Sequence, residues 1–175
     1  FDKAHRREVL FTEDEQHQLL GLPAEPGVSP HRMQRDTAGD WLKAASPQSK
    51  VFAVAIKARS AVSMGGRGPD AAYWYEPDLP GALSSTYYMD ELPAWVIEFN
   101  ALGLLAHFQR EGWFPLFPGS IDELCREDHF EAENDGVNTS FPHRLDEDIS
   151  SQIRSSPHGD DLTLRFAERL VDEEA

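Results

Sequence analysis

Two cationic side chains follow the most apolar stretch of the sequence. Residues 51–56 read VFAVAI, with no alternation of polar and apolar types, and Lys57 and Arg59 come directly after them. A strand that is apolar on both faces is typical of a parallel sheet covered by helices. If the extended conformation continues, the strand period of two puts Lys57 and Arg59 on the same side.

This placement suggests an anion site. Ligands of open α/β sheets bind just beyond the carboxyl ends of the strands. A guanidinium fork beside an ammonium point charge suits the oxygens of a phosphate group. The alternative is that Lys57 and Arg59 are two solvated charges at the end of a core strand. From the residues alone both interpretations stay open, and Lys57 and Arg59 are the candidate substrate-binding and catalytic residues.

Composition limits the class of protein. The chain has 175 residues, enough for one domain with a real core, and a net charge of −15. This charge argues against a nucleic acid polymer or an anionic membrane as partner, because the general field repels phosphate. No apolar run approaches the roughly 20 residues of a membrane span. Cys125 is the single cysteine, which excludes an internal disulfide and a thiolate zinc site within this chain.

The elements around the candidate site read as an α/β fold. We expect a helix that begins at Ser29 and Pro30, the buried strand at 51–56, and a strong helix from Pro93 to its end at Gly112. The remaining expectations are a hairpin of strands 71–75 and 83–88, and a last helix capped by Asp160 or Asp161. Residues 1–28 predict only a short helix or a loop.

Four regions follow from this pattern. Residues 1–28 form a polar lead-in, residues 29–112 an α/β core segment with its hairpin, residues 113–160 a loop-rich, cap-like region, and residues 161–175 a helix that returns to the core. Phe1 is not a natural initiator, and the last residues are helix-like without a stop signal. We therefore expect an internal piece of a longer protein.

Three weaker signals have simple alternatives. The glycine-rich residues 63–69 suit a flexible connector better than a nucleotide cradle, since no Gly-Lys-Ser/Thr follows. The Asp/Glu/His cluster at 127–135 invites a metal hypothesis, but its spacing matches no known ligand set and a solvated acidic surface is favoured. The aromatic residues of the hairpin would suit a stacking platform, so a non-catalytic binding or interaction module is the alternative function.

A family resemblance raises the phosphate hypothesis above its alternative. The run IKARSAV at 56–62, which continues to AAYWY at 71–75, resembles the central motif of bacterial alkaline phosphatases in the type I phosphodiesterase/nucleotide pyrophosphatase branch. Further similar stretches follow in the family's order: SP at 29–30, TAGDWL at 37–42, SSTYYM at 84–89, LPAWV at 92–96, FPH at 141–143 and LTLRFA at 162–167. The resemblance covers roughly residues 29–171. One departure is MGGR at 64–67, where the family often has Pro-x-Gly-His.

The resemblance implies a fold and an activity. The fold would be the central segment of an alkaline-phosphatase-like sheet flanked by helices, with a cap-like insertion. The full-length protein would be a two-zinc phosphomonoesterase or phosphodiesterase with a Thr or Ser nucleophile. Lys57 and Arg59 match the family's Lys-x-Arg pair, which contacts the non-bridging oxygens of the substrate phosphate.

The resemblance also implies what this chain lacks. No stretch matches the nucleophile motif or the zinc-ligand motifs, so we expect both to lie outside this chain. The isolated segment should then bind no zinc and be catalytically inactive. Its partners would be a phosphate-ester substrate and the rest of its own polypeptide, and the family's members are periplasmic or secreted.

Overall fold

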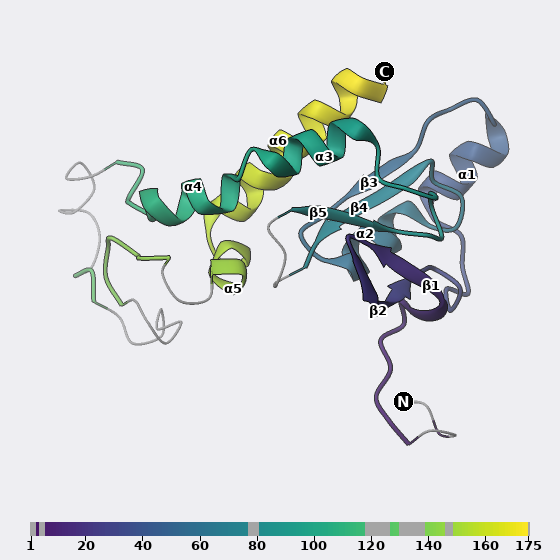
Figure 1. Ribbon diagram of the computed structural model, residues 1–175, viewed down its shortest axis with the longest axis horizontal. Helices are drawn as coiled ribbons and strands as arrows, with labels where there is room; N and C mark the ends of the chain where they lie inside the picture. The colour runs from purple at the N-terminus through teal and green to yellow at the C-terminus, as the bar shows by residue number, and fades with distance from the viewer. Residues whose placement is uncertain are drawn as a thin grey trace.

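The computed structural model describes residues 3, 6–76, 81–117, 127–129, 139–145 and 149–174, with only the backbone at 22–25 and 150–151. Five strands form one mixed sheet in the order β2-β1-β5-β4-β3 (Figure 1). The strands are β1 (Glu13–Leu20), β2 (Leu22–Val28), β3 (Phe52–Val54), β4 (Ala71–Tyr75) and β5 (Ala82–Ser85). The helices are α1 (Ala38–Ala45), α2 (Ala58–Gly65), α3 (Ala94–Ala101), α4 (Leu104–Glu111), α5 (Ile149–Arg154) and α6 (Pro157–Glu174).

Strands β3 and β4 pair in parallel, and the other pairs in the sheet are antiparallel. Helix α2 connects the two parallel strands, as a βαβ crossover requires. The hairpin of β4 and β5 aligns Trp74 with Leu83 and confirms the predicted pairing. The predicted α/β class is therefore confirmed, as a mixed sheet flanked by helices.

The two faces of the sheet bury different side chains. Tyr73 and Tyr75 of β4 pack on one face among side chains from α3, α4, α5 and α6. Ala72 and Trp74 face the opposite side, where they pack with Ala61 and Val62 of α2 and with side chains of β1 and β2. Figure 1 shows α3, α4 and α6 side by side along the first face. This alternation follows from the strand period of two.

Several predicted elements differ in extent. The strand expected at 51–56 is regular only from Phe52 to Val54, although the Ala55 N–H continues the ladder to the Tyr73 carbonyl at 3.1 Å. The helix expected from Pro93 to Gly112 is divided into α3 and α4, because Gly103 adopts a left-handed φ of 65°. The last helix begins at Pro157, before either predicted cap.

The N-terminal third contains the larger errors. A helix at Ser29 and Pro30 is wrong: α1 begins at Ala38 with Thr37 as its N-cap. The Ser29 hydroxyl instead donates a 2.5 Å hydrogen bond to the buried Asp14 carboxylate. The expectation of a helix or loop before residue 28 is also wrong, because β1 and β2 lie there and β1 pairs with β5.

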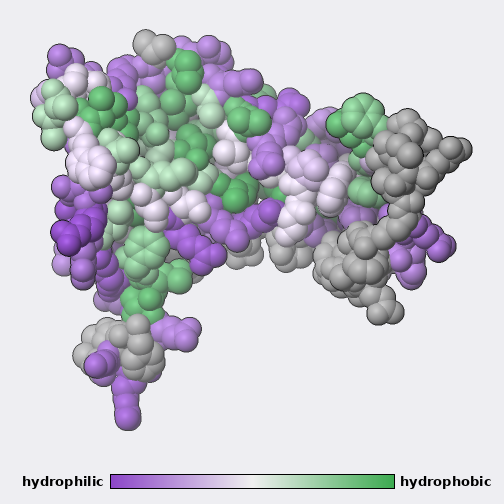
Figure 2. Space-filling view, turned by 180° about the vertical axis from the view of Figure 1, so that it is seen from behind, coloured by the Kyte–Doolittle hydropathy of each residue, from purple (hydrophilic) through white to green (hydrophobic). Residues whose placement is uncertain are grey.

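Apolar side chains are also exposed on the surface. Figure 2 shows green hydrophobic patches between purple hydrophilic ones over the face seen from behind. Trp41 on α1 is 65% exposed, and Leu116 after α4 is 84% exposed. Within the described residues, no helix is both long enough and apolar enough to cross a membrane.

Candidate functional site

Lys57 and Arg59 lie in the first turn of α2, at the carboxyl end of β3. Lys57 is the N-cap residue, with an extended backbone at φ −130° and ψ 137°, and Arg59 is the second residue inside the helix. The prediction that an extended chain places both on one side is wrong, because the backbone changes from strand to helix between them. The two cations are nevertheless kept within one helical turn of each other.

The chain leaves the sheet just before Lys57. Ala55 packs with the α2 cluster and Ile56 packs with the cluster on the opposite face. The chain then bends at Ile56 and Lys57, so the alternation of the strand does not continue to the Lys57 side chain. Lys57 is half-buried and Arg59 is exposed.

The local electrostatics favour an anion. The Lys57 side chain makes no capping hydrogen bond to its own helix. The N-terminus of a helix has unsatisfied N–H groups and the positive end of the helix dipole. Such an end attracts anions, and here two cationic side chains are added to it.

These two cations also have no internal counter-ion among the described residues. By contrast, Lys43 pairs with Asp70 at 2.7 Å and Arg67 pairs with Asp36 at 2.9 Å. Neither Lys57 nor Arg59 makes a comparable contact within the part of the chain that the structure describes. They therefore remain available to an anion from outside this segment.

The carboxylate of Asp40 holds the opposite end of α2. Its Oδ2 accepts hydrogen bonds from the N–H and the hydroxyl of Thr37, at 2.9 and 3.0 Å. Its Oδ1 accepts from the N–H groups of Arg67 and Gly68, both at 2.9 Å. Burial raises the pKa of Asp40, but these hydrogen bonds to the ionised form outweigh it and the pKa is lowered.

This contact changes the interpretation of the glycine-rich loop. The N–H groups of Arg67 and Gly68, which a nucleotide cradle would use, already donate to Asp40. The loop is also tied down by the Tyr87 hydroxyl, which donates to the Arg67 carbonyl at 2.9 Å. Both the nucleotide cradle and the flexible connector are therefore inconsistent with these contacts. The spacing of Thr37 and Asp40 is that of a capping box, which indicates a helix start but not the contact of Asp40 with the loop after α2.

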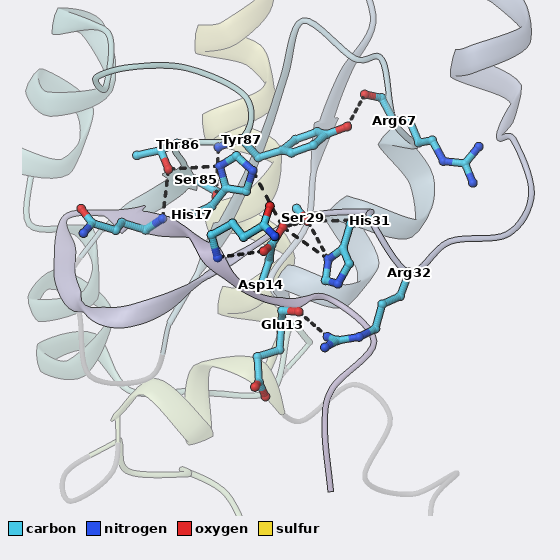
Figure 3. A network of polar contacts seen from close by, with 12 residues as sticks. Glu13, Asp14, His17, Ser29, His31, Arg32, Arg67, Ser85, Thr86 and Tyr87 are labelled. Carbon is cyan, nitrogen blue, oxygen red and sulfur yellow. Dashed lines mark hydrogen bonds and ion pairs between the residues drawn. The ribbon is translucent and has the colours of Figure 1, made fainter. Parts of the chain in front are cut away.

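A second polar cluster surrounds Asp14 and was not predicted (Figure 3). Asp14 Oδ2 accepts from the Ser29 hydroxyl and lies 3.3 Å from His31 Nδ1 and 3.8 Å from His17 Nε2. The residue types are those of a hydrolase triad, in which one ring nitrogen of the histidine faces the serine and the other faces the carboxylate. Here the same nitrogen, His31 Nδ1, lies 3.0 Å from Ser29 Oγ and 3.3 Å from Asp14 Oδ2, so the arrangement is not that of a triad. The cluster connects β1 to the segment after β2.

The remaining histidines and acidic residues form no metal site among the described residues. His143 is buried between Trp113 and Phe141, at ring distances of 4.7 and 4.4 Å. Most of the cluster at 127–135 lies outside the described residues, and residues 127–129 are exposed. In the described part, no group of three or more His, Cys, Asp or Glu side chains could hold a metal ion. A zinc site does not fit these residues.

The aromatic hairpin is part of the core. Tyr73, Trp74 and Tyr75 are at most 4% exposed. These three side chains cannot present their ring faces to nucleic acid bases, which contradicts a stacking platform built on them, whereas Tyr87 and Tyr88 of the same hairpin are half-buried.

The chain thus has a mixed α/β sheet with two cations at the N-terminus of α2, and comparisons show which known proteins it is similar to. The chain is 33% identical over 179 residues to alkaline phosphatase PhoV of Synechococcus elongatus, covering 98% of this chain and 32% of PhoV. It is 31% identical to alkaline phosphatase PafA of Elizabethkingia meningoseptica, covering 33% of that protein. It is also 34% identical to a protein of Myroides odoratus named calcium-transporting ATPase, again over 33% of its length.

Solved structures agree with these relatives. Wild-type PafA matches 98% of the chain with a TM-score of 0.84 at 30% identity, and the match covers 35% of PafA. No family model matches the chain. The chain is thus a homologue of bacterial alkaline phosphatases and has the fold of the corresponding segment of PafA. It spans about a third of the length of the curated relatives.

Proposed function

We propose that this chain is the phosphate-binding segment of a phosphate-ester hydrolase. Lys57 and Arg59 would bind the non-bridging oxygens of the substrate phosphate. The observation that carries the proposal is their place: two cations without an internal counter-ion at the N-terminus of α2, in a segment homologous to alkaline phosphatases. Charge spreads over these oxygens during phosphoryl transfer, and fixed cations stabilise it.

A solved PafA variant supports the assignment. In it, a lysine and an arginine two positions apart are replaced by alanine, together with changes at a threonine and an asparagine. That variant matches this chain with a TM-score of 0.85. Lys57 and Arg59 have the same types and the same separation.

The resemblance extends the proposal to the whole polypeptide. Its zinc ions would act as Lewis acids and lower the pKa of bound water. The zinc ligands and the nucleophile would lie outside this chain, so the isolated segment should not turn over substrate. Phosphomonoester, phosphodiester or nucleotide pyrophosphate substrates and a periplasmic or secreted location follow from the resemblance in the same way.

The test uses the full-length polypeptide that contains this segment. Lys57→Ala and Arg59→Ala should each reduce kcat/KM for an aryl phosphate. The reduction should correspond to a loss of about 2–4 kcal/mol of transition-state stabilisation, the scale for losing one preorganised donor. Arg35→Ala is the control, because Arg35 is exposed and lies outside the α2 turn. Unchanged kinetics in both α2 variants would exclude the phosphate-binding role.

A second measurement tests the division of roles. The 175-residue chain is incubated with zinc and an aryl phosphate, and product is followed over hours. We expect no turnover above that of a Lys57→Ala, Arg59→Ala double variant. A substantial rate that this variant lacks would mean that the segment contains a complete catalytic site.

A further inference from the structure

We propose that Asp40 is a positioning residue that sets the orientation of α2 and thereby the place of Lys57 and Arg59. This inference rests on the proposed function, since it concerns how the two cations are held. Asp40 lies at the opposite end of α2 from the cations and has no place in the binding site itself.

The geometry makes Asp40 the link between two elements. Asp40 is the third residue of α1, where its Oδ2 completes a capping box with Thr37. Its Oδ1 takes the N–H groups of Arg67 and Gly68, which follow the end of α2. One carboxylate therefore fixes the start of α1 to the end of α2.

The C-terminal end of α2 packs tightly against Asp40. Gly66 is the C-cap of α2, with φ 81°, and its N–H donates to the Val62 carbonyl at 3.0 Å. A Cβ on Gly66 would lie 2.1 Å from Asp40 Oδ2. The Thr37 hydroxyl also contacts the Gly65 carbonyl, at 3.3 Å. The end of α2 is thus seated directly against Asp40.

Helix α2 transmits this constraint to the cations. It has eight residues, so its two ends are about 12 Å apart and move as a short rigid rod. Ala61 and Val62 in its centre are fully buried against the sheet. A shift at the Gly66 end would therefore tilt the helix about this contact and displace the Lys57 end.

Losing the Asp40 carboxylate should tilt α2 without unfolding it. The guanidinium of Arg67 also pairs with Asp36 and donates to the Met33 carbonyl, and Tyr87 holds the Arg67 carbonyl. These contacts keep the loop near α1. In Asp40→Asn an amide N–H₂ group replaces one carboxylate oxygen. Each of the two oxygens accepts at least one backbone N–H, so in either orientation the amide N–H₂ would face an N–H donor instead of an acceptor.

The experiment is a double-mutant cycle in the full-length polypeptide. Asp40→Asn alone should reduce kcat/KM for an aryl phosphate by about 10- to 100-fold, the scale for a small misplacement of a binding group. In a Lys57→Ala, Arg59→Ala background, the same change should cost much less, because both groups that it misplaces are gone. A merely structural loss would reduce both backgrounds by the same factor.

Two further variants keep the test decisive. Asp36→Asn is the control, since it removes a carboxylate that contacts Arg67 from the surface, and it should leave kcat/KM within about 2-fold. Thr37→Ala removes the hydroxyl that bonds the Asp40 carboxylate, the Asp40 N–H and the Gly65 carbonyl, but it keeps the carboxylate and its bonds to Arg67 and Gly68. It should therefore give a smaller loss in the same direction if Asp40→Asn does not fold. Circular dichroism reports the folded fraction of every variant.

The outcomes separate this inference from the proposed function. If Lys57→Ala and Arg59→Ala both leave the kinetics unchanged, the phosphate-binding role itself is wrong. If the Lys57→Ala, Arg59→Ala double variant is impaired but Asp40→Asn is additive with it or without effect, the phosphate-binding role stands and the positioning role of Asp40 is overturned. Non-additivity with a folded Asp40→Asn protein supports both.

Discussion

At the scale of single residues, this segment uses carboxylates and one amide to hold loops against the sheet. Asp14 accepts a hydrogen bond from Ser29, fifteen positions away, and Asp40 accepts two from N–H groups 27 and 28 positions away. Asn100 has the same role with its amide. These residues are polar, so no apolar pattern indicates them, and their partners are specified only by the fold.

The Asp14 cluster should make the free energy of unfolding depend on pH in the acid range. Burial raises the pKa of Asp14, but hydrogen bonds from Ser29 and Gln16 and the nearby His31 and His17 lower it below 3.8 overall. A carboxyl group with a lowered folded-state pKa stabilises the fold above its unfolded pKa, and this contribution disappears as the pH falls through the folded pKa. The stability advantage of wild type over Asp14→Asn should therefore be constant at pH 5–7 and shrink at lower pH.

Urea unfolding of both proteins between about pH 2.5 and pH 7 measures this difference, since the slope of stability against pH reports proton uptake. Asp172→Asn is the control, because Asp172 is exposed on α6. A wild-type advantage that does not change over the whole range would contradict the expected coupling.

Asn100 satisfies both backbone groups of one buried residue. The Ala82 N–H donates to Asn100 Oδ1 at 2.7 Å, and Asn100 Nδ2 donates to the Ala82 carbonyl at 2.9 Å. Asn100→Ala leaves both groups of the fully buried Ala82 unpaired, so it should lower the free energy of unfolding by about 1–3 kcal/mol. Gln48→Ala, an amide truncation at an exposed site, should change it little. Equal effects in denaturant unfolding would argue against this role.

At the scale of elements, glycines decide where helices end. Apolar spacing predicted one helix from Pro93 to Gly112, and the apolar residues do continue across the break. Gly103 interrupts it, because its left-handed backbone lets α4 begin in a new direction. Gly66 ends α2 with a positive φ as well, but with ψ −150° instead of 37°, and in a much more crowded place.

These two glycines provide a matched pair of substitutions. A Cβ on Gly103 would meet nothing within 4 Å, so Gly103→Ala should cost about 1–2 kcal/mol from the backbone conformation alone. Gly66→Ala adds a clash with Asp40 at 2.1 Å, and it should cost clearly more. Thermal unfolding of both variants tests this order. A larger loss for Gly103→Ala would mean that the junction with Asp40 is easily displaced.

Local patterns predicted the elements whose stability comes from apolar burial. The run at 51–56 predicted β3, and the two aromatic-rich strands predicted the β4–β5 hairpin. Strand β1 escaped notice because Glu13, Glu15 and Gln16 have no apolar period. Ser29 has the residue type of a helix cap, but its hydroxyl is used by Asp14, fifteen positions earlier in the chain. Such long-range hydrogen bonds override local preferences.

The candidate site was predictable in the same partial way. The order of residues placed Lys57 and Arg59 beyond a strand, and that much could be read from the sequence. The turn from strand to helix between them could not, because IKARSAV has no strong helix start signal. Asp40 was also hidden, since the two N–H groups that it holds lie 27 and 28 positions further along the chain.

At the scale of the whole molecule, α6 joins the last part of the chain to the sheet. Phe166 is fully buried, and its ring lies 5.1 Å from the rings of Tyr73, Trp95 and Phe99. Residues separated by up to 93 positions therefore share one aromatic cluster. This cluster supports the face of the sheet opposite to α2.

Truncation of Phe166 should be among the most destabilising changes. Phe166→Ala removes the centre of this cluster and should cost about 3–5 kcal/mol. Leu164→Ala on the same helix, at a residue that is 63% exposed, should cost less than about 0.5 kcal/mol. Denaturant unfolding of the two variants measures the difference, and similar values would show that α6 does not dock through Phe166.

The alternating faces of β3 have a consequence for how this segment can vary. Ala53 packs toward α2 and its neighbours Phe52 and Val54 pack toward the aromatic cluster, so the face that a side chain of β3 takes depends on whether an odd or an even number of residues precedes it in the strand. Exchanging one apolar residue for another in this run leaves that parity unchanged, whereas deleting a single residue reverses it. Length is therefore the property of this strand on which the packing of both faces depends most, and a deletion compensated by a nearby insertion should restore the stability that the deletion alone lowers.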